Sequence, residues 1–231
     1  MRSRPTATLY LGLLCRFEPE GVLSFLKVND SYDIDESLKY CSMHSMNKAS
    51  AYLLERKGDL EGALDFYLHE INRQLADVNF AEASELNQAD DTCSLAISLC
   101  VRSSEGKKRD FLRGKDHIVG SFWYKLAMTY VGAYQKGKTG LSRLGRKSLL
   151  GYIERVVGAA TSYLDSQKLS IYIIDEFQNI PLTDLREVVQ VLMDVSSFAM
   201  KTSTLAQNIS KQECIETIWN SYFHLTRSER L

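Results

Sequence analysis

The chain has 231 residues, 45% of them hydrophobic, and a formal net charge of -1 at pH 7. This length and composition allow a sizeable core, which excludes a predominantly disordered protein. The near-neutral charge excludes the strong positive field that sequence-independent nucleic-acid binding requires, so no nucleic-acid partner is expected. The 3 prolines leave most of the sequence free to form uninterrupted helices.

Turn and capping residues predict two short helices near the start of the chain. Pro19 and Glu20 can open a helix that continues from Val22 to Val28. Asp33, followed three residues later by Glu36, is the acidic variant of a capping box, and it predicts a helix from Ile34 to Cys41.

A helical hairpin is predicted next. Apolar residues recur at steps of three and four between Leu60 and Leu75, which places them on one face of a helix. A shorter stripe of the same kind precedes it, formed by Met46, Ala49 and Leu53. Gly58 can adopt the left-handed conformation that ends the first helix, and Asp59 can cap the second, so the two helices run antiparallel.

The rest of the chain is also predicted to be helical. Residues 103–116 are polar and aperiodic, which predicts a loop, whereas residues 118–134, 144–164, 185–202 and 215–225 each support a helix. The expected organisation is helical hairpin repeats over 1–102, a polar loop over 103–116 and a second helical sub-stack over 117–231. Because short helices cannot bury their apolar faces alone, the fold class is expected to be all-α, an α-solenoid of stacked antiparallel hairpins.

Three segments carry a family resemblance: Leu13–Leu26, Ser31–Cys41 and Lys48–Leu68. They resemble the clathrin-repeat-like solenoids of vacuolar protein sorting subunits, most closely the large CORVET-specific subunit, and the related HOPS subunits share the same kind of sequence. Residues 122–126, 147–165 and 180–194 resemble the same family more loosely.

The resemblance implies a non-catalytic scaffold in an endosomal or vacuolar tethering complex. Its implied partners are other tethering-complex subunits and a Rab GTPase, with a cytoplasmic location, peripheral on endosomal or vacuolar membranes. Family members also carry an N-terminal propeller and a C-terminal RING module; neither pattern occurs here, so a fragment or truncated product is expected. No catalytic residue, cofactor or metal ligand is assigned. A helical-repeat adaptor outside trafficking would share the fold and stays open as an alternative.

One phosphate-binding pattern offers a different function. Gly132, Gly137, Lys138 and Thr139 satisfy the GxxxxGK[ST] spacing, in which backbone N–H groups and the lysine hold phosphates and the threonine binds magnesium. Ile171–Glu176 imitates the apolar strand that ends in a magnesium-binding Asp and a catalytic Glu, so an ATPase or GTPase is the alternative.

The surroundings of this pattern favour a structural role over nucleotide binding. A phosphate loop must follow a buried strand in a parallel sheet, but the residues before Gly132 look helical as much as extended. The sequence therefore favours a turn between solenoid helices, with Asp175 and Glu176 as loop or helix-cap acids.

The remaining chemically reactive residues are expected to have packing or surface roles. The cysteines lack metal-ligand spacing and are interpreted as reduced core residues of a cytosolic protein: Cys15, Cys41, Cys93, Cys100 and Cys214. The histidines have no acid or cysteine at a catalytic or metal spacing: His44, His69, His117 and His224. Trp123 and Trp219 lie in helical patterns and are expected in the core or between helices, with a role as interface anchors as the alternative.

No segment is apolar enough for a membrane span or a secretory signal. Peripheral membrane association stays open, because two basic clusters could contact anionic lipid head groups, although solvation is the favoured interpretation. The clusters are Lys107, Lys108, Arg109, Arg113 and Lys115, and Lys136, Lys138, Arg143, Arg146 and Lys147. Partner contacts are expected on exposed helix faces and these clusters, with no single site residue named.

Overall fold

A computed structural model describes residues 4–76, 83–105, 121–136, 143–176, 186–207 and 212. Within these ranges the regular structure is helical and no strand occurs. The helices are α1 (Arg4–Phe17), α2 (Pro19–Val28), α3 (Ile34–Met43), α4 (Asn47–Lys57), α5 (Leu60–Ala76), α6 (Ala83–Ser104), α8 (Phe122–Lys136), α9 (Arg143–Ala160), α10 (Ser166–Glu176) and a further helix over residues 186–207.

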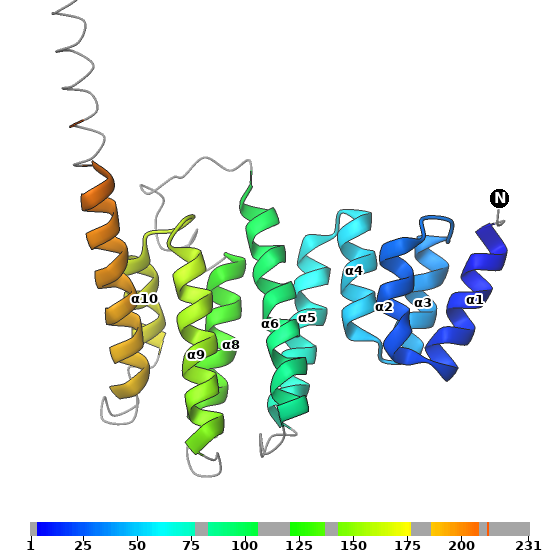
Figure 1. The fold of residues 1–231 in the computed structure, drawn as a ribbon, viewed down its shortest axis with the longest axis horizontal. Coiled ribbons are helices and arrows are strands. Elements are labelled where there is room, and N and C mark those ends of the chain that lie inside the picture. Colours follow the sequence, from blue (N-terminus) through cyan, green and yellow to red (C-terminus); the bar gives the residue numbers. More distant parts are fainter. Residues whose placement is uncertain are drawn as a thin grey trace, which may run out of the picture.

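The helices stand side by side in a row, with α1 at one end and residues 186–207 at the other (Figure 1). Among the helices described, α1, α5, α6 and α8 each contact the next described helix and also the one after it, as α1 does with α2 and α3. Such a stack buries apolar faces between successive helices, which confirms the predicted α-solenoid of antiparallel hairpins.

The turn between α4 and α5 has the predicted chemistry. Gly58 ends α4 with φ of 91°, in the left-handed region, and the N–H of Asp59 donates to the carbonyl of Leu54 at 3.0 Å. The Asp59 side chain then accepts the N–H of Gly62 at 2.9 Å, which caps the first turn of α5. The glycine and the aspartate together reverse the chain within two residues.

The starts of α2 and α3 also follow from local sequence. Pro19 is the first residue of α2, where the missing N–H costs nothing. Asp33 caps α3, since its side chain accepts the N–H of Glu36 at 2.9 Å. The backbone N–H of Asp33 donates to Thr8 of α1 at 3.0 Å, so the cap is tied to the first helix.

In the part of the chain that the structure describes, two hydrophobic core clusters meet at α4. Leu53 belongs to the first cluster, which is built from α1 to α4. Leu54, the next residue, belongs to the second cluster, which extends from α4 to the helix at residues 186–207. Because adjacent residues on a helix point about 100° apart, α4 packs on both sides.

Several helix boundaries differ from the predictions. The helices α1, α6 and α10 were not singled out by the sequence patterns, α3 extends two residues beyond Cys41, and the helix predicted to reach Leu164 ends at Ala160. Ser103 and Ser104, predicted as loop, end α6. Residues 106–116 of the predicted loop and the helix predicted over 215–225 lie outside the described residues, and the division into two sub-stacks stays a prediction.

Candidate functional site

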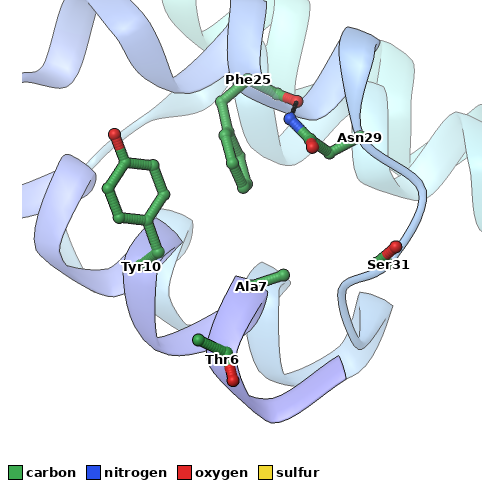
Figure 2. A pocket seen from close by; sticks show the side chains of 6 residues that line it. All are labelled: Thr6, Ala7, Tyr10, Phe25, Asn29 and Ser31. Carbon is green, nitrogen blue, oxygen red and sulfur yellow. Dashed lines mark hydrogen bonds between the residues drawn. The ribbon is translucent and has the colours of Figure 1, made fainter. Parts of the chain in front are cut away.

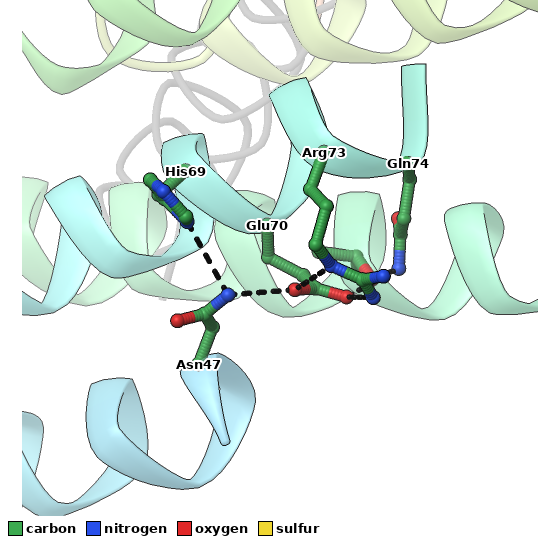
Figure 3. A network of polar contacts seen from close by, with 6 residues as sticks. Asn47, His69, Glu70, Arg73 and Gln74 are labelled. Atoms are coloured by element: carbon green, nitrogen blue, oxygen red, sulfur yellow. Dashed lines mark hydrogen bonds and ion pairs between the residues drawn. The ribbon is translucent and has the colours of Figure 1, made fainter. Parts of the chain in front are cut away.

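A polar network joins α4, α5 and α6 (Figure 3). Its centre is Glu70, a carboxylate that is 5% exposed. Arg73 donates two hydrogen bonds to Glu70, at 2.6 and 3.1 Å, and Asn47 donates one at 2.8 Å. Gln74 donates to Glu70 at 3.0 Å and to Thr92 of α6 at 3.1 Å, so the network crosses the interfaces of α5 with α4 and with α6.

The network keeps Glu70 charged. Burial raises the pKa of the Glu70 carboxyl, but the hydrogen bonds from Arg73 and Asn47 lower it by more than burial raises it. The pKa of Glu70 therefore lies below its ordinary value. Burial lowers the pKa of Lys48, which stands near Glu70 and Asp91. The hydrogen bonds of Glu70 and Gln74 therefore link α5 to α4 and to α6.

A groove of about 510 Å³ opens beside the network. Its walls come from α2, the start of α4, α5 and α6, and they include Glu20, Lys48, Arg73 and Asp91. Charges of both signs therefore line the groove.

A second cavity, of about 570 Å³, lies between α1 and the end of α2. Figure 2 shows the rings of Tyr10 and Phe25 at one side of it, with centroids 5.2 Å apart. The side-chain amide of Asn29 donates to the carbonyl of Phe25 at 3.1 Å and thereby finishes α2. The cavity combines the aromatic surface of Tyr10 and Phe25 with short polar side chains such as Thr6 and Ser31.

An apolar stripe runs along α1 beside this cavity. We define the α1 outer face as Leu9, Leu13 and Phe17, which are 63%, 55% and 73% exposed. The three residues are spaced four apart, so they lie on one side of the helix. The opposite side of α1, including Leu11, is buried against the stack.

The structure places part of the phosphate-binding pattern inside a helix. Gly132 lies within α8, whereas Gly137, Lys138 and Thr139 lie outside the described residues. Tyr134, within the same pattern, is buried and donates to Glu187 at 2.6 Å. What precedes the pattern is therefore helix, and the buried strand that a phosphate loop requires does not occur in the residues described here.

The segment Ile171–Glu176 is not a strand. It forms the second half of α10, where Ile171 is exposed and Ile173 is buried. The interpretation of Asp175 and Glu176 as loop or cap acids is corrected as well, because both belong to the last turn of α10. Their helical position follows from the four-residue spacing between Leu169 and Ile173, both of which are buried.

Other predicted residues have packing roles where the structure describes them. Cys15, Cys41, Cys93 and Cys100 are free and buried, as expected, and Cys214 lies outside the described residues. Trp123 is buried and donates to Ser104 at 3.1 Å, whereas Trp219 lies outside the description. His44 and His69 are exposed, while His117 and His224 fall in ranges not described.

The first basic cluster, Lys107 to Lys115, and Lys138 lie outside the described residues, and Lys136, Arg143 and Lys147 are exposed. In the described ranges no group of three or more metal-ligating side chains occurs. None of the helices described is long and apolar enough to cross a membrane.

Comparison with known proteins supports one family. No protein-family model matches the chain, and no solved structure matches it significantly. The geometry itself defines the class of stacked-helix, α-solenoid proteins.

Within that class the chain is similar to the vacuolar protein sorting-associated protein 8 homolog of mouse. It is 35% identical to it over 103 residues, which are 42% of this chain and 7% of the mouse protein. It is 23% identical to the human homolog over 160 residues, which are 67% of this chain and 11% of the human protein. The chain is homologous over part of its length to these proteins, which confirms the resemblance seen in the sequence, and it spans a small part of their length.

Proposed function

We propose that the chain is a scaffold segment of an endosomal tethering complex of the CORVET type, and that it acts by binding other subunits of that complex. The homology to vacuolar protein sorting-associated protein 8 homologs carries the proposal. Its working location is the cytoplasmic side of endosomal or vacuolar membranes, and a Rab GTPase is a further partner through the assembled complex.

The stack supports this function physically. Each helix is held by its neighbours, so surfaces on successive helices keep a fixed spacing. The α1 outer face offers apolar residues four apart, which is the arrangement that receives an amphipathic helix. We propose that an amphipathic helix of another tethering subunit packs on this face and places a side chain in the cavity beside Tyr10.

A pair of matched variants tests the proposal. Leu13 and Leu144 are the same residue type and are 55% and 52% exposed, but Leu144 lies at the start of α9, away from α1. We would express three tagged chains in cells of the source organism: the wild type, Leu13→Glu and Leu144→Glu. Tethering subunits are then quantified after affinity capture of each chain. We expect capture with wild type and Leu144→Glu, and at least tenfold less with Leu13→Glu, because an interface carboxylate would be buried unpaired.

Two results would contradict the proposal. Capture of no tethering subunit by the wild type would leave a helical-repeat adaptor outside trafficking as the better interpretation. Magnesium-dependent ATP or GTP turnover by the purified chain, lost in Lys138→Ala, would instead favour the nucleotide-binding alternative. Equal capture by both glutamate variants would reject the α1 outer face as the contact while leaving the scaffold role intact.

A further inference from the structure

Two thiols from different helices touch in the N-terminal core cluster. The sulfurs of Cys15 in α1 and Cys41 in α3 are 3.9 Å apart, and the residues are 3% and 0% exposed. We propose that Cys15 and Cys41 are a redox-modification site, at which a reversible disulfide links α1 to α3.

The two sulfurs are already in contact across a packed pair of helices, because α1 packs on α3 and the sulfurs lie 3.9 Å apart. A disulfide needs about 2.05 Å between its sulfurs, so bond formation requires the two atoms to approach by roughly a further 1.9 Å, through side-chain rotation and a small adjustment of the helices. By contrast, Cys93 and Cys100 lie seven residues apart on α6. Their Cα atoms are therefore about 10 Å apart along the helix, beyond the roughly 7 Å that a disulfide can bridge.

The two thiols also differ in acidity. The hydrogen bond with Cys41 lowers the pKa of the Cys15 thiol, whereas the same contact and burial raise the pKa of Cys41. Either sulfur can donate the hydrogen bond between them, but Cys15 is the less buried of the two, at 3% exposed against 0%. We therefore assign Cys15 as the first nucleophile, attacking as the thiolate, and Cys41 as the resolving cysteine.

The reaction balances with a small-molecule disulfide as oxidant. The Cys15 thiolate attacks one oxidant sulfur, forms a mixed disulfide and releases one small thiolate, which takes up the proton that Cys15 lost. Cys41 then gives up its proton and attacks the Cys15 sulfur, releasing the second small thiol. The two protein thiols lose two electrons, and the oxidant disulfide gains them to become two thiols.

The location of the pair gives the bond a consequence. α1 stands at the end of the row and packs on α2 and α3 among the described helices (Figure 1). Because Cys15 is 3% exposed and Cys41 is 0% exposed, the oxidant reaches them when α1 opens locally from α3. Once the bond has formed, α1 cannot separate from α3, so oxidation holds the α1 outer face in place.

The first experiment uses the full chain and oxidised glutathione. After oxidation, free thiols are blocked with N-ethylmaleimide in denaturant, and peptides are analysed by mass spectrometry. We expect a peptide that joins Cys15 to Cys41, a mass loss of about 2 Da from the two departing hydrogens, and reversal by dithiothreitol. The double variant Cys93→Ser/Cys100→Ser should keep the cross-link, and Cys15→Ala should lose it.

The wild-type chain alone can overturn the proposal, so a variant that misfolds does not protect it. Recovery of Cys15 and Cys41 as N-ethylmaleimide adducts to the same extent as Cys93 and Cys100 would reject the site. Hydrogen exchange supplies the second measurement: amides of α1 should exchange at least tenfold more slowly in the oxidised chain, with α9 unchanged. Equal exchange of α1 in both states would reject the restraint of α1.

Discussion

The turn at Gly58 gives the most direct test of the stack, because adding one methyl group at Gly58 should lower the stability of the chain. Gly58 adopts φ of 91°, and a Cβ added there would meet no atom within 4 Å. Gly58→Ala therefore introduces backbone strain without a steric clash. The expected effect is a loss of stability that depends only on the left-handed turn.

The magnitude follows from two opposing effects. A left-handed conformation costs a non-glycine residue about 1–2 kcal/mol. Alanine also reduces the freedom of the unfolded chain, which offsets about 0.4–1 kcal/mol. We expect a net loss of about 1 kcal/mol in the free energy of unfolding, which for a chain of this size lowers the melting temperature by roughly 3 °C. Asparagine tolerates this conformation better, so Gly58→Asn should lose less.

Urea unfolding followed by circular dichroism measures the change, with Gly151→Ala as the matched control. Gly151 lies inside α9, and an added Cβ would again meet nothing within 4 Å. The same chemical change should therefore stabilise α9, by up to about 1 kcal/mol. If Gly58→Ala were as stable as the wild type or more stable, the assignment of a left-handed conformation to Gly58 would be wrong.

Three further substitutions test other parts of the chain. Because the pKa of Glu70 lies below its ordinary value of 4.5, its stabilisation is complete above that pH and is lost as the pH falls through the folded pKa; Glu70→Gln should cost about 1–2 kcal/mol at neutral pH and flatten this acid dependence in urea titrations. Tyr134→Phe removes the hydrogen bond to Glu187 and should cost about 1 kcal/mol, with faster amide exchange in residues 186–207. Gly132→Ala should raise the free energy of unfolding by about 0.5–1 kcal/mol, and with it the melting temperature, because Gly132 is helical. A loss of stability would contradict the helix at this position.

Local sequence was sufficient where one or two residues determine the backbone. Gly58 and Asp59 predicted the turn, and Asp33 with Glu36 predicted the start of α3, because capping groups act within a few residues. The helix α10 was harder to predict from the sequence, because the apolar run in Ile171–Glu176 is compatible with either a buried strand or a helix. Its periodicity became clear only with Leu169 included, which the strand interpretation left out.

The candidate site depended on contacts between distant residues. Glu70 lies in the predicted helix from Leu60 to Leu75, but nothing in its neighbourhood in the sequence indicates that Asn47, 23 residues earlier, would hydrogen-bond to it. Leu9 and Leu13 have helical spacing, yet only the packed structure shows which side of α1 is buried. The order of the helices in the stack, which determines both features, is not encoded in local propensity.

The polar network and the double-sided packing of α4 together fix the register of the stack. Leu53 and Leu54 place α4 in both core clusters, but apolar contacts alone tolerate small shifts of one helix along another. The polar network is less permissive, because a shift of α5 would break the hydrogen bond from Asn47 to Glu70 and the one from Gln74 to Thr92. Arg73 would stay paired with Glu70, since both lie on α5, so the cost is about 1.5–3 kcal/mol for the lost bond to the charged group. The apolar clusters therefore supply most of the stability, whereas the network on α5 selects one arrangement of α4, α5 and α6, and with it the spacing between the α1 outer face and the rest of the scaffold.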